Sequence, residues 1–474
     1  MFTPARIRLL VVTCCTLFMA MLDNLVLGVA LPSIQRSFNA GMTDLQWFMN
    51  AYTLAFSVLL IPFSMMGERF GRKRMFLAGV VLFTVGSALC GLSGNSLQLI
   101  LSRALQGVGG AAIVPLSLTL VNAGFPENMR AAAFGIWSGI SGLGLSIGPL
   151  IGGLIVEGAP WQMIFWVNVP IGLLALLFGN FWLAEMKGER KPLDLPGVLL
   201  IAAGLFGIVY GLEQGNTKGW GSLEVIGSLV AGAVLLILFY VWERGRETPY
   251  IRFALFRSRR YTAYIFTGFW LNAGIFGAIF LLTLFLQQAQ GYSALEAGVR
   301  TMVWTGCTMV CAPLAGFAVG RFGSRTVLTV GMTAQALALA GFAVLIASSG
   351  VDVPFLWQAP LMMLAGAGMG LSFTSLAHGV MTSVPEQSSG EASGISNATR
   401  ELGGVFGIAI SGLIFESGAA IRTPDDFGAH LVPALWAGAA MIVLGVAFVL
   451  LLAGTWFAGR KLKHAEVQLT GTNV

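Results

Sequence analysis

The stretch that decides the fold is Gly139-Ile-Ser-Gly-Leu-Gly-Leu-Ser-Ile-Gly-Pro-Leu-Ile-Gly-Gly153, inside an apolar segment (131–156) that has no charged residue. Gly144, Gly148 and Gly152 recur every four residues, so they share one face of a helix. A glycine face lets another backbone approach closely, which is how helices associate in lipid. In water such a helix would be unstable, because each interior glycine costs about 1 kcal/mol relative to alanine. The stretch therefore predicts a closely packed helix inside a membrane.

The composition extends this prediction to the whole chain. Of the 474 residues, 56% are apolar and only 10% are charged, whereas a soluble domain carries about 25% charged residues. The five cysteines all fall in apolar segments, which indicates packing residues rather than a disulfide or metal framework. We expect an all-α membrane protein that crosses the bilayer many times.

Apolar stretches long enough to cross a bilayer, which takes about 20 residues, follow one another along the chain. We count fourteen, at residues 9–32, 45–66, 75–95, 97–122, 131–156, 161–183, 194–213, 223–242, 261–288, 295–319, 326–348, 354–382, 392–417 and 430–457. An even number of spans places both chain ends on the same side of the membrane.

The basic residues indicate which side that is. If both ends are inside, inner loops and tails hold 21 of the 27 lysines and arginines, outer positions hold four, and Arg103 and Arg400 lie within spans. Because basic loops tend to stay in the cytoplasm, both ends are predicted to be cytoplasmic. We expect the protein to lie in the cell membrane.

An internal repeat divides the spans into related groups. A shift of 259 residues superimposes Gly107 on Gly366 and Gly109 on Gly368, and the matches continue through residues 392–414. Parallel repeats with a binding site at their interface are a transporter architecture. The prediction is a first six-helix half, an inserted pair of helices and a second six-helix half, at residues 1–190, 191–257 and 258–474.

The loop between the second and third spans reads Gly67-Glu68-Arg69-Phe70-Gly71-Arg72-Lys73-Arg74. Membrane topology alone explains a basic inner loop. An acid among four cations beside a turn glycine also suggests a device that forms ion pairs in one conformation and releases them in another. We name residues 67–74 the latch loop, with the candidate residues Glu68, Arg69, Gly71, Arg72 and Arg74.

Two charged residues lie at lipid depth in the first half. At 1.5 Å per residue, Asp23 is about 21 Å from the inner face and Arg103 roughly 9–10 Å from the outer face. Their depths coincide in a hydrocarbon core of about 30 Å. A carboxylate at this depth usually marks a pathway or a proton relay, and desolvation favours its neutral form. Asp23 is therefore either a proton carrier tuned by Arg103 or a purely structural partner of that arginine.

The second half carries a charged pair of its own. Arg400-Glu401 stands where the repeat has Ser141-Gly142 in the first half. The two residues form a structural ion pair, or Glu401 is a second proton carrier, and both alternatives stay open. Glu213, at the outer end of the seventh span, is expected to be solvated.

Several kinds of chemistry have no motif in this chain. The sequence lacks the phosphate-binding pattern G-x-x-x-x-G-K-[ST], zinc-ligand spacing and a nucleophile elbow. We therefore expect no enzyme activity, no metal and no cofactor. Energy for active transport would come from an ion gradient.

Together these motifs resemble the major facilitator superfamily, and within it the fourteen-span drug:proton antiporters of the EmrB/QacA type. The resemblance covers nearly the whole chain. Leu22-Asp23-Asn24 with Ala30-Leu31-Pro32 is similar to the family's span-1 motif, and Arg103 with Gln106 and Gly107 is similar to its span-4 motif. The latch loop resembles the loop motif, with Glu68 in place of the usual aspartate.

Later segments carry the more specific matches. The antiporter motif of span 5 is represented by Gly144, Gly148, Pro149, Gly152 and Gly153. Trp161-Gln-Met-Ile-Phe165 with Asn168-Val-Pro170 resembles the signature that opens span 6, with Gln162 in place of the usual arginine. Leu193-Asp194 with Gly197 resembles the start of span 7.

The resemblance implies a major facilitator fold with fourteen transmembrane helices, and export of lipophilic, often cationic compounds in exchange for protons. The halves would rock about a central cavity, with Asp23, Arg103 and Glu401 in proton coupling. Candidate substrate-binding residues are Asn24, Trp137, Phe276, Trp304 and Phe373. For any single one of these aromatic residues, packing against lipid is the alternative role. The expected partners are a small-molecule substrate, protons and the lipid bilayer, without nucleic acid, and the expected state is a monomer.

Two other functions stay open. A carrier of the same superfamily could serve one natural product, sugar or organic anion, and a cavity with more cations than acids would favour it. A membrane sensor that does not transport would bind its ligand without any pH-linked flux.

Overall fold

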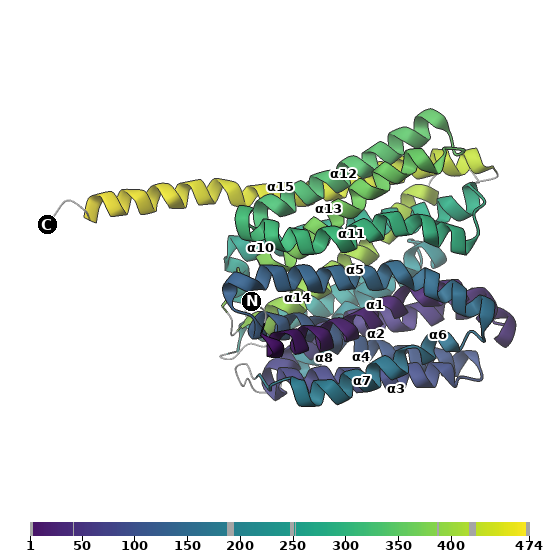
Figure 1. Ribbon diagram of the computed structural model, residues 1–474, viewed down its shortest axis with the longest axis horizontal. Helices are drawn as coiled ribbons and strands as arrows, with labels where there is room; N and C mark the ends of the chain where they lie inside the picture. The colour runs from purple at the N-terminus through teal and green to yellow at the C-terminus, as the bar shows by residue number, and fades with distance from the viewer. Residues whose placement is uncertain are drawn as a thin grey trace.

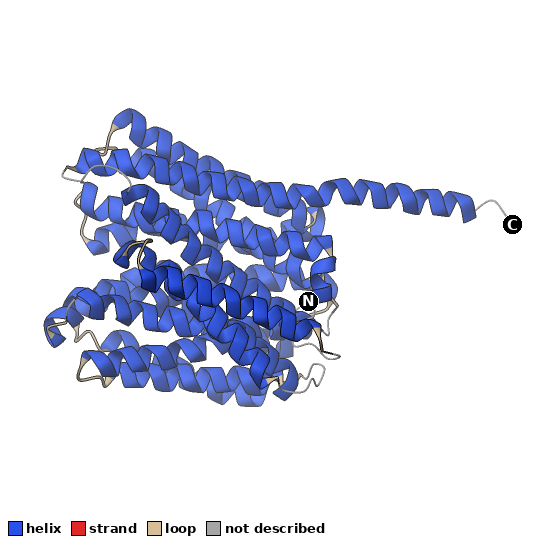
Figure 2. Cartoon of the chain, turned by 180° about the vertical axis from the view of Figure 1, so that it is seen from behind, coloured by secondary structure: helices blue, strands red, loops and turns tan. Residues whose placement is uncertain are grey.

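The computed structural model describes residues 3–40, 42–186, 194–246, 251, 253–385, 388–416 and 423–470. The side chains of Asn24 and Pro149 lie outside the described part, as do the side chains after residue 451. The predicted boundary between residues 190 and 191 also lies outside it. Every regular element within the described ranges is helical (Figure 2).

The helices follow the order of the apolar stretches. Their bounds are α1 (Pro4–Phe38), α2 (Met42–Phe70), α3 (Arg72–Gly91), α4 (Ser96–Gly124), α5 (Glu127–Gly158), α6 (Met163–Trp166), α7 (Asn168–Trp182), α8 (Leu195–Lys218), α9 (Leu223–Arg244), the 3₁₀ helix η1 (Phe253–Arg257), α10 (Arg259–Leu284), the π-helix η2 (Phe285–Ala289), α11 (Ala294–Phe322), α12 (Ser324–Ser349), α13 (Phe355–Met381), α14 (Ser389–Glu416) and α15 (Pro424–Thr470).

Polar residues before the apolar runs fix where several helices begin. Asn95 and Ser222 each accept a backbone hydrogen bond from the first turn of the helix that follows, α4 and α9 respectively. Ser293 and Glu296 form a reciprocal capping box at the start of α11. These bonds satisfy backbone donors that the first turn of a helix leaves free.

Thirteen helices within the described residues are long and apolar enough to cross a membrane. They correspond to the predicted spans except the fifth. At the fifth position lies α5, a helix of 32 residues that contains the glycine stretch. The protein is therefore an all-helical, multi-pass membrane protein.

The helices form two groups that lie side by side (Figure 1). In the first group α1 packs on α4, α5 and α7, and α3 and α2 both pack on α4. In the second group α10 packs on α14 and α15, and α12 packs on α13 and α15. The groups are joined mainly by α5 with α11 and α2 with α14, and also by α5 with α13 and α4 with α14. The hairpin α8–α9 packs against α2 and α14 through α8, so it contacts both groups at their junction.

The sequence repeat is also a repeat of helix contacts. A side chain at Gly109 of α4 would collide with the backbone of Phe83 in α3. In the second group, a Cβ at Gly368 of α13 would lie 3.0 Å from the backbone nitrogen of Gln335 in α12. Equivalent helices thus approach backbone to backbone in both groups, as close packing in lipid requires.

A second pair of repeated glycines makes the same kind of contact. A side chain at Gly107 would collide with the carbonyl oxygen of Tyr52, and one at Gly366 with the carbonyl oxygen of Trp304. The glycines are 259 residues apart, which is the shift of the sequence repeat, and their partners are 252 residues apart. The repeat therefore extends to α2 and α11.

The glycines of α5 have two different partners. A Cβ at Gly144 would lie 2.9 Å from the carbonyl oxygen of Phe18 in α1, within the same group. Gly135 and Gly139 face α11 of the other group, where a Cβ at Gly139 would lie 3.2 Å from the carbonyl oxygen of Met309. The two groups thus approach each other closely at Gly135 and Gly139, which precede the predicted glycine face in the sequence.

The rest of the glycine stretch is buried as well. Gly148, Gly152 and Gly153 lie buried further along α5. A Cβ at Gly153 would lie 3.2 Å from the side chain of Leu295 in α11, so α5 follows α11 over much of its length.

One end of the molecule gathers basic residues and the chain ends. Arg6 lies 3.8 Å from the sulfur of Met129, and Arg8 lies over the ring of Trp182. Lys73 of the latch loop donates a hydrogen bond of 2.7 Å to a carbonyl near the end of α7. The start of α1 and the projecting end of α15 lie on this side in Figure 1. Successive spans therefore run in opposite directions, which is the topology on which the division of basic residues between inner and outer loops is based.

The glycine contacts give a first prediction. Gly109→Ala should lower the unfolding temperature in detergent by several degrees, because its Cβ meets backbone atoms that cannot move aside. Gly306→Ala, at a helical glycine with nothing within 4 Å of its Cβ, should be neutral or stabilising. Thermal unfolding followed by gel filtration measures both. Equal stability of the two variants would mean that α3 and α4 are not in backbone contact.

Candidate functional site

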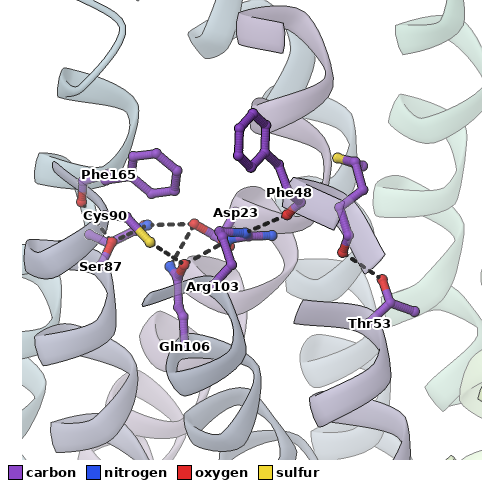
Figure 3. A network of polar contacts seen from close by, with 10 residues as sticks. Asp23, Phe48, Thr53, Ser87, Cys90, Arg103, Gln106 and Phe165 are labelled. Atoms are coloured by element: carbon purple, nitrogen blue, oxygen red, sulfur yellow. Dashed lines mark hydrogen bonds and ion pairs between the residues drawn. The ribbon is translucent and has the colours of Figure 1, made fainter. Parts of the chain in front are cut away.

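Four helices of the first group meet at a polar network around Asp23 (Figure 3). Asp23 comes from α1, Ser87 from α3, Arg103 and Gln106 from α4, and Asn168 from α7. Each of the five residues has at most 1% of its surface exposed. Arg103 and Gln106 reach the same point because residues three apart share a helix face.

The Asp23 carboxylate accepts hydrogen bonds from three donors. Its Oδ2 accepts from Arg103 Nη1 at 2.5 Å, and its Oδ1 accepts from Gln106 Nε2 at 2.8 Å and Asn168 Nδ2 at 3.0 Å. Arg103 Nη1 also donates to Gln106 Oε1 at 2.7 Å, which orients the amide. Asp23 and Arg103 thus form a direct ion pair, at the common depth that their positions in the sequence indicate.

The Arg103 guanidinium is enclosed on its other sides too. Its Nε donates to the carbonyl oxygen of Phe48 at 3.2 Å. The guanidinium lies 4.5 Å from the ring centroid of Tyr52 and 5.9 Å from that of Phe165. Aromatic faces attract a desolvated cation, so the charge is compensated without water.

Ser87 and Asn168 form an outer layer of the network. Asn168 Nδ2 donates to Ser87 Oγ at 3.1 Å, and Ser87 Oγ donates to the carbonyl oxygen of Phe165 at 2.8 Å. From the sequence, Asn168 is identified only as part of the signature that opens span 6, and Ser87 is missed. The available signal was a hydroxyl inside an otherwise apolar span, which is common and weak by itself.

The cost of burying two charges explains why the network contains so many hydrogen bonds. Removing a carboxylate and a guanidinium from water is costly, and only good geometry with further hydrogen bonds offsets that cost. Protonation of Asp23 would remove the attraction and leave Arg103 as a buried charge without its counter-ion. The arrangement can therefore couple uptake of a proton by α1 to a rearrangement of α4. The carboxylate is enclosed within the first group and does not line an opening between the groups.

Tyr52 connects this network to the second group. Arg103 lies over its ring, and Glu401 of α14 is close enough to interact with it electrostatically. Nearby, Leu54 of α2 and Val405 of α14 pack in one apolar cluster. Glu401 precedes Val405 by one helical turn and shares its face. Glu401 is therefore on the side of α14 that faces the first group.

Arg400 points to other neighbours. Its guanidinium lies 4.7 Å from the ring centroid of Phe373, and its Nε has no hydrogen-bond partner among the described residues. A Cβ at Gly404 would lie 3.5 Å from the ring of Phe276. α14 thus gathers two charges, which interact electrostatically with each other, and two of the predicted aromatic residues.

Trp137 and Trp304, also predicted as substrate-binding candidates, are buried. Trp137 Nε1 donates to Ser117 Oγ at 3.0 Å, which ties α5 to α4. The indole nitrogen of Trp304 has no partner in the described part of the chain. Of the two, only Trp304 keeps a donor for a ligand in this conformation.

The latch loop joins the first group to α14 of the second. Arg72 donates to Glu68 from Nε at 3.0 Å and from Nη2 at 2.8 Å, and Nη2 also donates to Ser389 Oγ at 3.1 Å. Glu68 packs against Gly390 in the first turn of α14. The positive end of a helix dipole favours such an acid. The groups are therefore in contact at this end of the molecule.

Glu185, which sequence reasoning missed, organises the other half of the latch loop. Its Oε1 accepts from the backbone N–H of Lys73 at 3.1 Å, and its Oε2 lies 3.7 Å from Arg74. Gly71 has a φ of 111°, and a Cβ there would lie 2.5 Å from Glu185 Oε1. Position 71 therefore needs glycine for its backbone and for its contact. Arg69 lies over an adjacent phenylalanine ring at 5.2 Å.

The expectation that Glu213 is solvated is met only in part, because the residue is half-buried. Its Oε2 is buried and has no hydrogen-bond partner among the described residues. The reason is that α8 packs against α2 and α14 and encloses this end of the helix.

Fold and site together define a membrane carrier. Two helical groups of repeated design meet along α2, α5, α11 and α14, and one of them encloses a charged network. Within the described ranges, no group of three or more His, Cys, Asp or Glu side chains could hold a metal ion. The chain belongs to the Major Facilitator Superfamily, whose model matches residues 13–408. It is therefore a transporter that handles small molecules within the membrane.

Similar proteins include several that confer drug resistance. The chain is 34% identical over 417 residues to the tetracenomycin C resistance and export protein of Streptomyces glaucescens, covering 88% of this chain and 77% of that one. It is 36% identical over 407 residues to the multidrug resistance protein Stp of Mycobacterium tuberculosis, covering 85% and 75%. It is 31% identical over 438 residues to the methylenomycin A resistance protein of Bacillus subtilis, covering 92% and 93%.

A solved structure shares the fold. The human organic anion transporter MFSD10 matches with a TM-score of 0.70 at 15% identity, covering 94% of this chain and all of that one, 100%. At this identity the likeness concerns the fold alone.

The ion pair gives a second prediction. Arg103→Gln leaves Asp23 buried without its counter-ion, and removing one partner of a buried pair costs about 3–5 kcal/mol. The double variant Asp23→Asn/Arg103→Gln should be more stable than Arg103→Gln, because neither charge remains. Thermal unfolding in detergent measures the difference. Arg74→Gln, at a side chain that is 74% exposed, is the control and should unfold like the wild type. A wild-type unfolding temperature for Arg103→Gln would contradict the desolvated pair.

Proposed function

We propose that this protein exports drugs in exchange for protons and belongs to the fourteen-span group of the EmrB/QacA type. Support comes from the resistance and export proteins among its relatives, and from thirteen candidate spans with α5 as the fourteenth. The two halves are residues 1–190 and 258–474, with the inserted pair at 191–257. Both ends lie in the cytoplasm and the protein in the cell membrane. It acts as a monomer, without a cofactor or nucleic-acid partner.

The buried ion pair of Asp23 and Arg103 is the observation that carries proton coupling. A gradient-driven exporter needs a group that takes up a proton on one side and releases it on the other. Asp23 is an acid whose charge is balanced by a single guanidinium at lipid depth, so protonation changes the local charge by one unit. Glu401 is the second proton carrier in this proposal, because it lies beside Tyr52 at the junction.

The substrate binds at the junction between the halves. Phe276 and Phe373 offer ring faces to lipophilic compounds, and Glu401 offers negative charge to cationic ones. Both rings approach α14, which belongs to the junction. The further candidates are Asn24, Trp137 and Trp304.

Alternating access requires that the latch end open. In the conformation described here, Arg72 reaches Ser389 across the junction, and Ser393 Oγ donates to the carbonyl oxygen of Pro115 at 3.0 Å. Opening this end breaks both contacts. Release of the Glu68–Arg72 pair from α14 would be the step that permits it.

A carrier for an organic anion is the second candidate. Arg400 favours it, because a buried guanidinium with an unpartnered Nε could bind a carboxylate or sulfate group. A transport panel of cationic, neutral and anionic compounds in proteoliposomes distinguishes the two functions. Exclusive transport of anions, lost in Arg400→Gln, would select the anion carrier.

The third prediction tests proton coupling. In proteoliposomes with an imposed pH gradient, the wild type should move ethidium against its concentration gradient, whereas Asp23→Asn should give only background flux. Glu157→Gln, at an exposed acid at the end of α5, is the matched control and should transport like the wild type. Full gradient-driven efflux by Asp23→Asn would remove this residue from the mechanism. A drug-susceptibility panel in an efflux-deficient host, with and without a protonophore, tests the function itself.

The fourth prediction concerns the latch loop. Glu68→Ala removes the acid that holds Arg72 beside α14, so the latch end should open more often. In a cysteine-free protein carrying Ser388→Cys, a buried position next to the contact, maleimide should then react several-fold faster. Glu157→Gln, at the far end of α5, should leave the labelling rate unchanged. Equal rates in the Glu68→Ala and parent proteins would show that this acid does not hold the end closed.

A further inference from the structure

The inserted pair α8–α9 carries a half-buried acid, Glu213, that the two halves do not explain. The Oε2 atom of Glu213 is fully enclosed and has no hydrogen-bond partner among the described residues. A buried carboxylate oxygen without a donor is costly, so such groups are neutral or meet a cation. The position therefore calls for a proton or for a positively charged ligand.

The side chain of Glu213 leaves α8 on the face away from α9. A Cβ at Gly207 would lie 2.7 Å from the carbonyl oxygen of Ser228 in α9, and one at Gly211 would lie 2.8 Å from its Oγ. Glu213 follows Gly211 by two residues, or about 200° around the helix. Val209 lies one turn before Glu213 on the same face and is completely buried, at 0% exposure.

This face of α8 meets both halves of the transporter. Val209 packs in an apolar cluster with Leu54 of α2 and Val405 of α14, and Trp47 and Tyr210 pack at its edge. The ring centroids of Trp47 and Tyr210 are 6.4 Å apart. We name this contact of α2, α8 and α14 the seam. A carboxyl beside apolar and aromatic side chains is the setting in which proteins bind lipophilic cations.

The other charged groups around the seam have partners or lie elsewhere. Lys218 at the end of α8 pairs with Glu224 of α9, and the hydroxyl of Tyr210 donates to the same carboxylate at 2.5 Å. On α2, Asp44 near the start of the helix has interactions of its own. On α14, Glu401 lies one turn from Val405 toward the start of the helix, whereas Glu213 lies one turn beyond Val209 toward the end of α8.

We propose that the seam binds a lipophilic cation through Glu213, and that a proton occupies this carboxyl when the seam is empty. The proposal rests on the export function above and gives the inserted pair a share in substrate recognition. Because the proton and the cation exclude each other, binding of the cation releases one proton and is weakened by acid.

Equilibrium binding of radiolabelled tetraphenylphosphonium to the purified full-length protein in detergent tests this inference. The wild type should bind more tightly at about pH 8 than at about pH 6, because protons compete with the cation for the carboxylate. Glu213→Gln should bind about tenfold more weakly at the higher pH, with a smaller difference between the two conditions. Glu157→Gln is the control, because this exposed acid lies on α5, which is not part of the seam, and it should bind like the wild type.

Wild-type affinity of Glu213→Gln at both pH values would overturn the proposal, as would a wild-type protein that does not bind the cation. If the variant loses binding and the wild type shows no efflux, cation binding at the seam would be supported and the export function would be overturned. If Glu213→Gln does not fold, Glu213→Asp decides. Shortening the anchor by one methylene should weaken binding several-fold, and unchanged binding would contradict the proposal.

Discussion

The structure depends on one constraint, which is that a charge inside the bilayer must be compensated by protein. Asp23 and Arg103 satisfy it for each other, and Gln106, Asn168 and Ser87 complete the hydrogen bonding. The four helices that carry these residues must therefore keep a fixed register. The network thus ties α1, α3, α4 and α7 to one another through charged and polar side chains.

Close contact between helix backbones also stabilises the fold. Apolar side chains gain little by leaving lipid, so helices must gain stability from contact of their backbones. Gly109 and Gly144 bring α4 and α5 against neighbours in their own group, and Gly139 brings α5 against α11 of the other group. Close glycine contacts thus occur both within a group and between the two groups.

The sequence predicts the fold well because lipid imposes simple rules. The apolar stretches match the helices closely, and equal depth brings Asp23 and Arg103 together. Two site features escape such rules. Glu185 and Lys73 are 112 residues apart, so nothing local links them. Glu213 looked solvated because the position of a residue within a span does not reveal which face of an added helix turns toward protein.

The repeat relates the position of Asp23 in the first half to a different kind of contact in the second half. The shift of 251 residues that relates Phe18 to Phe269 puts Gly274 in the place of Asp23. There, a Cβ at Gly274 would lie 2.5 Å from the carbonyl oxygen of Gly438 in α15, so bare backbone replaces the charged centre. The same place in the repeated unit thus holds a buried ion pair in the first half and an uncharged backbone contact in the second. The second half therefore carries its buried charges, Arg400 and Glu401, on α14 where the two groups meet, and the first half carries Asp23 and Arg103 inside its own bundle.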